Sequence, residues 1–355
     1  MVSPLDWGLG HATRCIPVIR QLLRLDFEVI IGAEGRAAAL LAREFPQLEL
    51  VAIPGYDILY PKGSGMALHM GMQLPRISRA IRGEHTFLDK MVKDRRLDAV
   101  ISDNRFGLWS VKVPSIYMTH QLTIKAPPAM ALTEFFLHRM HARYIRNFGE
   151  CWIPDLEGKD GLSGDLAHKR PGPVPTFFIG PLSRFIAASP AAEKKYDLMF
   201  IISGPEPQRS IFEDITMQAL SSGRHKALVL TGKPEQTKNQ VHHESIEVQP
   251  HMDTSAMQAA MLSSDLVICR SGYSTIMDLA TLGCRAVFVP TPGQTEQEYL
   301  ARYHTEKGHY FHLRQDKFDL DRMISGSKGY EGIKITNDEH LLKERINELA
   351  SRLDG

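Results

Sequence analysis

The fold is decided by residues 264–299, which read SDLVICRSGYSTIMDLATLGCRAVFVPTPGQTEQEY. Leu266–Cys269 is a short apolar run, typical of a strand that is buried on both faces. Ser271-Gly272 follows as a turn and candidate helix cap, and the next apolar residues recur at helical spacing until Gly283 ends the helix. Ala286–Val289 is a second buried strand. The stretch therefore predicts one βαβ unit with parallel strands and a right-handed crossover.

The start of this helix is suited to binding an anion. A helix N-terminus exposes unpaired N–H groups and carries roughly half a positive charge, which favours a diphosphate. Asp278 lies within about two turns of that start, where its carboxylate is placed to accept hydrogen bonds from ribose hydroxyls. Gln294, Glu296 and Gln297 follow the second strand, at the edge where open α/β sheets bind ligands. An ordinary βαβ unit with a solvated acid explains the same pattern equally well.

Several residues of this stretch resemble the donor-binding region of the GT-B glycosyltransferases. They are Arg270-Ser271-Gly272, Asp278, Phe288-Val289-Pro290 and Gln297-Glu298-Tyr299. The likeness is strongest to the family 28-like N-acetylglucosaminyltransferases that form lipid II in peptidoglycan synthesis. The resemblance implies that the acid at Asp278 holds the ribose of UDP. The family has Glu at this position, so the side chain here is one methylene shorter.

Composition sets the class of protein. The 355 residues are long enough for two domains with full-sized cores. The 42 basic and 41 acidic residues nearly cancel, so no global field attracts nucleic acid. Four cysteines without metal spacing predict free thiols in a reducing compartment. With no run of 18 apolar residues and no visible signal peptide, we expect a cytoplasmic protein.

The first motif of the chain is DWGLGHATR, residues 6–14. Gly8 and Gly10 lie in a turn between a first strand and a helix, where glycine lets a ligand approach the backbone closely. A nicotinamide-dinucleotide fingerprint fails here because its third glycine would be Thr13. Only Met1 to Leu5 precede the motif, so we expect either a short first strand or further residues upstream.

His11 is the candidate general base. It lies in the first turn of the predicted helix, where the dipole disfavours an imidazolium, and a neutral imidazole can accept a proton. A single histidine is more often structural. The motif resembles the Gly-rich loop of the same family, which ends in Gly-His. It also resembles the Gly-x-Gly-His-x-x-Arg-Cys run of nucleotide-sugar hydrolases on this fold, which supplies the main alternative.

Two further strands are predicted to end in polar clusters at the carboxyl edge of the first sheet. Ala99–Ile101 leads to Asp103, Asn104 and Arg105, and Pro114–Tyr117 leads to His120 and Gln121. His120-Gln121 resembles the His-Glu-Gln of the family without its middle acid. Together with Gly8 and Gly10, these residues are the predicted acceptor side.

Three other segments of the first half carry weaker signals. Residues 55–75 are rich in Gly, Pro and Met, which favours a surface loop over an adaptable lipid-binding segment. Phe135–Phe148 interleaves arginines with aromatic residues, so an ordinary amphipathic helix competes with peripheral contact to an anionic membrane. Trp152–Pro154 is the expected last strand of the first domain.

The second half carries the other donor-binding candidates. Ile179–Phe185 resembles the Gly-x-Pro-x-Arg junction of the family, which implies a donor-phosphate contact for Arg184. Ser203 and Gly204 begin a turn after a strand where the family cradles phosphates. Pro205 and Pro207 carry no N–H, so the cradle is reduced to Ser203, Gly204 and Arg209. The resemblance also implies a backbone contact to the base near Met252.

The predicted fold is α/β, with two doubly wound Rossmann-like domains that face each other across a cleft, as in GT-B proteins. The expected bounds are 1–180 for the acceptor-side domain and 181–337 for the nucleotide-sugar-binding domain. Residues 338–355 are an expected helix that packs back on the first domain.

The predicted activity is an inverting, metal-independent transfer of a sugar from a UDP-sugar substrate, with no cofactor, in the synthesis of bacterial cell-envelope glycan. The acceptor is an unidentified glycan or lipid-linked hydroxyl. The alternatives are a nucleotide-sugar hydrolase, a nucleotide-sugar epimerase and a non-catalytic donor-binding subunit.

Overall fold

The computed structural model describes residues 1–6, 8–56, 66–158, 161–186, 193–233, 240–243, 245–335 and 340–353. The chain forms two compact units. The first unit comprises Met1–Leu182 together with Asp338–Gly355, and the second comprises Ser183–Asn337. The boundaries predicted from the sequence lie after residues 180 and 337. Each unit is described by itself.

The first unit is built on a parallel sheet. Its strands are β1 (Val2–Pro4), β2 (Ile30–Gly32), β3 (Glu49–Val51), β4 (Val100–Asp103), β5 (Ser115–Met118), β6 (Glu150–Ile153) and β7 (Thr176–Phe178). Their order is β3-β2-β1-β4-β5-β6-β7, and every neighbouring pair is parallel. The order reverses between β1 and β4, which is the switch point of a doubly wound sheet.

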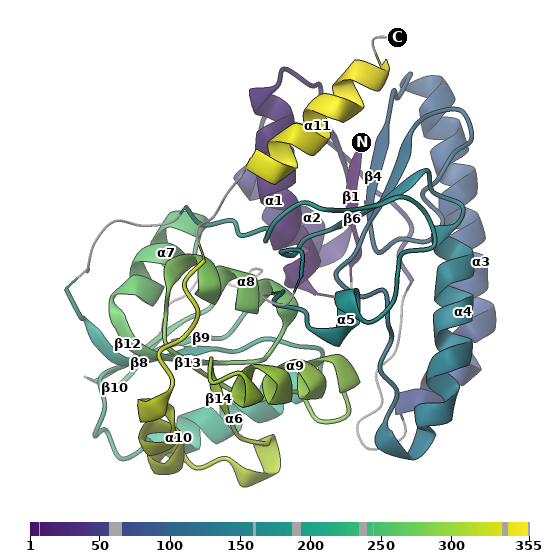
Figure 1. Ribbon diagram of the computed structural model, residues 1–355. Helices are drawn as coiled ribbons and strands as arrows, with labels where there is room; N and C mark the ends of the chain where they lie inside the picture. Colours follow the sequence, from purple (N-terminus) through teal and green to yellow (C-terminus); the bar gives the residue numbers. More distant parts are fainter. Residues whose placement is uncertain are drawn as a thin grey trace. The chain divides into compact units, whose positions relative to one another are not determined.

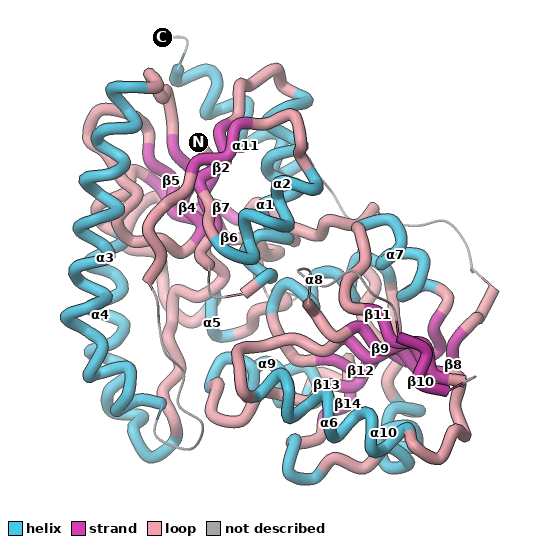
Figure 2. Tube along the Cα trace, turned by 180° about the vertical axis from the view of Figure 1, so that it is seen from behind, coloured by secondary structure: helices cyan, strands magenta, loops and turns pink. Residues whose placement is uncertain are grey.

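Helices cover both faces of this sheet. They are α1 (Leu9–Arg24), α2 (Gly35–Glu44), α3 (Met66–Asp94), the 3₁₀ turn η1 (Pro128–Thr133), α4 (Glu134–Ile145), α5 (Asp165–His168) and α11 (His340–Leu353). Figures 1 and 2 show α1, α2 and α11 on one face and α3 and α4 on the other. Since α11 belongs to the first unit, the chain returns to this sheet after completing the second.

Two expectations for the first unit were wrong. Trp152 lies in β6, and β7 pairs beyond it, so residues 152–154 are not the last strand. Thr176–Phe178 is only three residues long and partly buried, which leaves a weak periodic signal. Residues 66–75 begin the long helix α3 and do not form a loop, although Pro75 lies inside it. The remainder of that segment, 57–65, lies outside the described residues.

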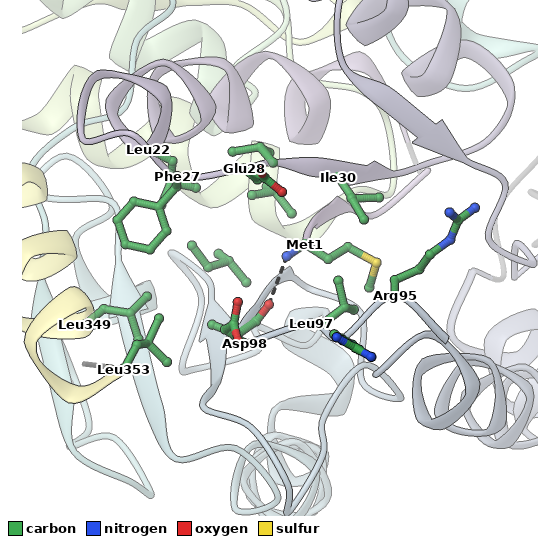
Figure 3. A pocket seen from close by; sticks show the side chains of 15 residues that line it. Met1, Leu22, Phe27, Glu28, Ile30, Arg95, Leu97, Asp98, Leu349 and Leu353 are labelled. Atoms are coloured by element: carbon green, nitrogen blue, oxygen red, sulfur yellow. Dashed lines mark hydrogen bonds between the residues drawn. The ribbon is translucent and has the colours of Figure 1, made fainter. Parts of the chain in front are cut away.

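A cavity of about 120 Å³ lies at the amino edge of the first sheet, where β1, β2 and β4 begin. Figure 3 shows Leu22 and Phe27 on one part of its wall and Leu349 and Leu353 of α11 on another. The Met1 amino group donates a hydrogen bond to the Ala99 carbonyl oxygen at 2.9 Å. Ligands of open α/β sheets bind at the opposite, carboxyl edge, so this cavity is not part of the candidate site.

The second unit repeats the same plan. Its strands are β8 (Tyr196–Ile201), β9 (Ala227–Leu230), β10 (Gln240–His243), β11 (Ile246–Gln249), β12 (Ser264–Cys269), β13 (Ala286–Phe288) and β14 (Phe311–His312). Their order is β10-β11-β9-β8-β12-β13-β14. Only β10 runs antiparallel to its neighbour among the described strands, at the edge. The predicted parallel pair in 264–299 is β12 and β13.

The helices of this unit are α6 (Gln208–Leu220), α7 (Thr254–Leu262), α8 (Tyr273–Leu282), α9 (Thr295–Glu306) and α10 (Leu320–Gly326), with 3₁₀ turns η2 (Gln315–Lys317) and η3 (Ser327–Gly329). Figure 1 shows α7 and α8 on one face of the sheet and α6 and α10 on the other. Gly283 ends α8 in the left-handed conformation, as predicted. Of the predicted cap Ser271-Gly272, Gly272 is the N-cap of α8, and the Ser271 hydroxyl donates to the Gln297 backbone carbonyl at 2.8 Å.

Candidate functional site

In the first unit, the candidate residues gather at the switch point between β1 and β4. His11 lies in the first turn of α1, which follows β1, and Asp103 is the last residue of β4. Gly8 precedes the helix with a φ of 141°, a conformation that L side chains rarely adopt. The glycine at this position therefore allows the sharp entry into α1 that brings His11 over the end of the sheet.

One buried cluster connects these residues. The His11 Nδ1 lies 3.1 Å from Asp103 Oδ2, and Arg14 Nε donates to the same carboxylate oxygen at 2.8 Å. Arg14 Nη2 also donates to Asp103 Oδ1 and lies 2.7 Å from His11 Nδ1. The fourth member is His120, whose Nδ1 lies 2.9 Å from Arg14 Nη1. The cluster thus joins α1, the end of β4 and the loop after β5.

Burial and neighbouring charges set the protonation of this cluster. Burial lowers the pKa of His11, Arg14 lowers it further, and Asp103 acts in the opposite direction. Burial alone would raise the pKa of Asp103, but Arg14 and His11 outweigh it and hold the pKa below the usual value. The result is a charged carboxylate beside a neutral imidazole. The neutral ring expected from the helix dipole therefore has burial and Arg14 as its main causes.

Arg14 was missed as a site residue. Its side chain is 2% exposed, and its guanidinium touches the other three members of the cluster. The sequence contains two signals for it. The Gly-x-Gly-His-x-x-Arg-Cys run includes Arg14, and residues three apart, such as His11 and Arg14, share a helix face. The partner Asp103 is distant in the chain, so only the fold shows that Arg14 faces it.

The other predicted acceptor-side residues lie in the same region of the first unit. Asn104 directly follows β4 with a φ of 58°, and its side-chain oxygen accepts a hydrogen bond from the Tyr117 hydroxyl at 3.0 Å. Gln121 follows His120, and its backbone N–H donates to the Thr119 hydroxyl oxygen at 3.1 Å. Gly10 lies inside the first turn of α1.

Arg105 is a correction to the predicted acceptor side. Its side chain is fully buried and forms an ion pair with the equally buried Glu84 at 2.7 Å. It also donates to the backbone carbonyls of Pro4 and Pro54. Glu84 in turn accepts from the Gly107 N–H and the Tyr56 hydroxyl. Arg105 therefore ties α3 to the ends of β1 and β4, and its donors point into the protein.

The second unit has its own switch point, between β8 and β12. Ser203 and Gly204 follow β8, and Gly204 has a φ of 108°, which requires glycine. Ser271 and Gly272 follow β12 and lead into α8. A Cβ atom added to Gly272 would meet no atom within 4 Å, so the start of α8 is open to a ligand.

Asp278 lies on α8 and is 8% exposed. It accepts a hydrogen bond from the Ser183 hydroxyl at 2.6 Å, and Arg184 Nε lies 3.8 Å from its other oxygen. Burial raises the pKa of Asp278 to about 6, although Arg184 and Ser183 act in the opposite direction. The structure thus brings together two predicted donor-binding residues, Arg184 and Asp278, and adds Ser183 to them.

Two arginines predicted to bind the donor have structural partners. Arg270 is 1% exposed and donates to the carbonyls of Val289 and Gln208 and to the Gln315 side chain. Its guanidinium therefore connects the ends of β12 and β13 to α6 and η2, and its donors have partners within the protein. Arg209 forms ion pairs with Glu206 and Glu213. Because these carboxylates neutralise Arg209, we assign it a structural role.

A network of amides and hydroxyls follows β13. Gln297 accepts from the Thr291 N–H at 2.9 Å and donates to Gln294 at 2.6 Å. Glu296 lies in the first turn of α9. The Thr291 hydroxyl is buried beside Gly204 and has no hydrogen-bond partner within the described residues. Sequence reasoning missed Thr291, because a lone threonine after a strand has no distinctive pattern.

Met252 lies in the loop between β11 and α7 and is partly buried. Within the described residues, no group of three or more His, Cys, Asp or Glu side chains is arranged to hold a metal ion. In the same part of the chain, no helix combines the length and apolar character that a membrane span requires.

Comparison with known proteins bears on both units. Residues 202–330 match the glycosyltransferase family 28 C-terminal domain. A protein of Methanosarcina mazei described as an uncharacterised glycosyltransferase is 23% identical over 369 residues, which cover 98% of this chain and 93% of that protein. The UDP-N-acetylglucosamine–N-acetylmuramyl-(pentapeptide) pyrophosphoryl-undecaprenol N-acetylglucosamine transferase of Haemophilus ducreyi is 23% identical, with 89% and 85% of the two chains covered.

The solved structures confirm the fold. The spinosyn rhamnosyltransferase SpnG superposes with a TM-score of 0.63 at 14% identity, covering 99% of this chain and 95% of that chain. Together with the two doubly wound sheets, this similarity confirms the predicted class of two Rossmann-like units of GT-B type.

Proposed function

We propose that this chain, a family 28-like glycosyltransferase with the GT-B fold, transfers a sugar from a UDP-sugar to an acceptor hydroxyl with inversion and without a metal ion. Its enzyme class rests on the family match and on the descriptions of its relatives. The donor, the stereochemistry and the independence of metal are our proposal. A cytoplasmic location is part of the same proposal.

The observation that carries the chemistry is the His11–Asp103 pair at the switch point of the first unit. The base role requires the tautomer whose Nδ1 proton points to Asp103 Oδ2, 3.1 Å away, while Arg14 Nη2 donates to Asp103 Oδ1 and not to the ring. The Nε2 lone pair is then free to accept a proton. His11 then takes the proton of the acceptor hydroxyl, and the acceptor oxygen forms a bond to the anomeric carbon of the donor. The bond from that carbon to the diphosphate breaks on the opposite face, which inverts the configuration.

The second unit supplies the donor contacts. The open start of α8 offers backbone N–H groups to the diphosphate, and Arg184 adds a positive charge. Asp278 accepts a hydrogen bond from the Ser183 hydroxyl through Oδ1, which leaves Oδ2 for a ribose hydroxyl. The buried Thr291 hydroxyl beside Gly204 supplies a further polar group. Stabilising the leaving diphosphate with these groups is the reason for proposing that no metal is needed.

The acceptor we propose is a glycan or a lipid-linked hydroxyl, and peripheral contact with a membrane is part of this proposal. The support is a surface on α4 and the turn before it. Leu132, Phe136 and Met140 are 92%, 71% and 39% exposed. Exposed arginines lie on α4 itself and on α3, namely Arg76, Arg79, Arg82, Arg139, Arg143 and Arg146. Exposed apolar side chains beside several cations suit the interface of an anionic bilayer.

Vesicle flotation tests the membrane contact. We expect the protein to float with phosphatidylglycerol vesicles and to stay behind with phosphatidylcholine vesicles. Phe136→Ser should reduce the bound fraction because it removes an apolar anchor. The matched control is Val111→Ser, which changes a residue of the same unit that is 90% exposed and outside this surface. Equal binding of the wild type to both vesicle types, or equal losses in both variants, would contradict the contact.

Transfer itself is tested by incubating the protein with UDP-sugars and a cell-envelope extract. We expect UDP release that depends on the extract and a new glycoside of inverted configuration. Release of free sugar at the same rate without extract would identify a hydrolase, the alternative that the Gly-Leu-Gly-His-Ala-Thr-Arg-Cys run also favours. UDP binding without any turnover would identify a donor-binding subunit, and an isomeric UDP-sugar would identify an epimerase.

A further inference from the structure

Arg14 is the central charge of the first-unit cluster, and its position beside the His11–Asp103 pair has a chemical consequence. A buried carboxylate next to an imidazole normally favours the imidazolium, because the two then form an ion pair. A histidine held in that form cannot accept a proton from a substrate. The pair alone would therefore weaken His11 as a base at neutral pH.

The guanidinium of Arg14 changes this balance. It occupies both oxygens of Asp103 and lies 2.7 Å from His11 Nδ1, so a second positive charge on the ring would face a permanent cation. Arginine stays charged in proteins and has only donors, so it cannot relieve this repulsion by losing a proton. Arg14 thus satisfies the charge of Asp103 while leaving the imidazole neutral.

We propose that Arg14 is a positioning residue that keeps His11 in its unprotonated, base-competent form by neutralising Asp103. The proposal rests on the proposed role of His11 as the base. It also explains why the cluster uses arginine, since the fork can bind the carboxylate through Nε and Nη2 while Nη1 reaches His120 Nδ1 at 2.9 Å.

The groups that face His11 come from three elements. Arg14 belongs to α1, Asp103 ends β4, and His120 follows β5. The thiol of Cys15, 3.9 Å from Asp103 Oδ2, is a further titratable neighbour of the carboxylate, and so is Tyr117, whose pKa burial raises well above the usual value. Burial raises the pKa of this thiol well above its usual value, so it stays neutral and adds no charge to the balance.

The test is a titration of His11 in the folded protein, followed by nuclear magnetic resonance of ¹³Cε1-labelled histidine. The His11 signal is assigned by its absence in His11→Gln. In Arg14→Met, Asp103 keeps its charge but loses its cation, so the His11 midpoint should move to higher pH than in the wild type. The acid limb of the transfer rate should move with it, and a midpoint that rises by one pH unit lowers the rate on that limb about tenfold.

Two more variants separate charge balance from simple packing. Arg14→Lys keeps a cation and should keep the low midpoint, even if the contact with His120 is lost. The double variant Arg14→Met with Asp103→Asn removes both charges, so burial should again hold the His11 midpoint low. If packing damage caused the shift, the His11 midpoint would be at least as high in the double variant as in Arg14→Met, because two replacements disturb the cluster more than one.

Arg20→Met is the matched control, because Arg20 is on the same helix and pairs with Glu44 away from the cluster. It should leave the His11 midpoint unchanged. A folded Arg14→Met protein with the wild-type midpoint would overturn the proposal, as would a double variant whose midpoint stays high. Should Arg14→Met fail to fold, an upward shift in Arg14→Lys would overturn it. The titration needs no substrate, so a protein that lacks transferase activity still tests Arg14.

Discussion

The two switch points share a sheet plan and differ in their chemistry. In the first unit, charged and titratable side chains face one another, with Arg14 between Asp103 and two histidines. In the second unit, the arginines that follow the strands are bound to backbone carbonyls or carboxylates, and the residues at the switch point are rich in hydroxyls, amides and backbone N–H groups. Asp278 and Arg184 are the charged exceptions, and burial opposes the charge of Asp278.

This difference indicates a division of labour on a common scaffold. A group that moves a proton needs neighbours that set its protonation, and the first switch point provides them. A group that holds a diphosphate and a ribose needs donors and acceptors with little reorganisation, and the second switch point provides those. The four predictions below test whether the division is real.

The largest expected effect is the loss of turnover when His11, at the first switch point, is replaced. His11→Gln keeps the size of the side chain but cannot take a proton at neutral pH, so turnover should fall by about 10²–10⁴-fold. UDP affinity, measured by calorimetry, should hardly change, because the proposed donor contacts belong to the second unit. His340→Gln is the matched control, since His340 is 62% exposed on α11. Near-normal turnover in His11→Gln would end the assignment of the base.

The next effect is on stability, and it tests whether Arg105 belongs to the functional residues of the first switch point. Arg105→Ala leaves Glu84 buried without its cation, which should cost about 3–5 kcal/mol of unfolding free energy in urea. The control Arg95→Ala breaks a half-exposed pair with Glu49 and should change stability little. An Arg105→Ala protein that is as stable as the wild type but impaired in transfer would contradict the structural role and support the predicted acceptor-side role.

A smaller effect is expected on the affinity for UDP when Asp278, at the second switch point, is replaced. Asp278→Ala should weaken UDP binding by about 1–3 kcal/mol, the scale for a lost charged hydrogen-bond partner. Asp265→Ala, an exposed acid of β12, is the control. Because the pKa of Asp278 is raised to about 6, its ionised form increases as pH rises through 6, and UDP affinity should increase with it. In Asp278→Asn that pH dependence should vanish; unchanged affinity in a folded Asp278→Ala protein would exclude the ribose contact.

The last prediction is that removing metal ions leaves the transfer rate unchanged. Transfer should keep its full rate after extensive dialysis against a chelator, because the proposed stabilisation of the diphosphate comes from α8 and Arg184. The control is a metal-dependent glycosyltransferase treated in the same way. A rate that is lost and then restored only by Mn²⁺ or Mg²⁺ would contradict the proposed division between proton transfer and diphosphate binding. Stabilising the diphosphate at the second switch point would then depend on a cation that the chain does not supply.

The sequence by itself determined the central βαβ unit of the second unit and the class of fold. Residues 264–299 carry local signals that need no tertiary context, such as apolar runs for β12 and β13 and Gly283 for the end of α8. The motif around His11 likewise locates a glycine turn at a helix start. Local spacing is enough to predict these elements because the hydrophobic periodicity and the residue that ends each element lie within the element's own sequence or next to it.

Only the tertiary structure decided which charged side chains are functional candidates. Arg14 and Arg105 have the same chemistry in the sequence, yet one faces the His11–Asp103 pair and the other is buried against Glu84. Arg270 follows a strand in the way a ligand-binding residue does, but its donors meet carbonyls from distant parts of the chain. The role of a long, flexible cation depends on the partners that the fold brings to it, and those partners lie too far along the chain for spacing to predict.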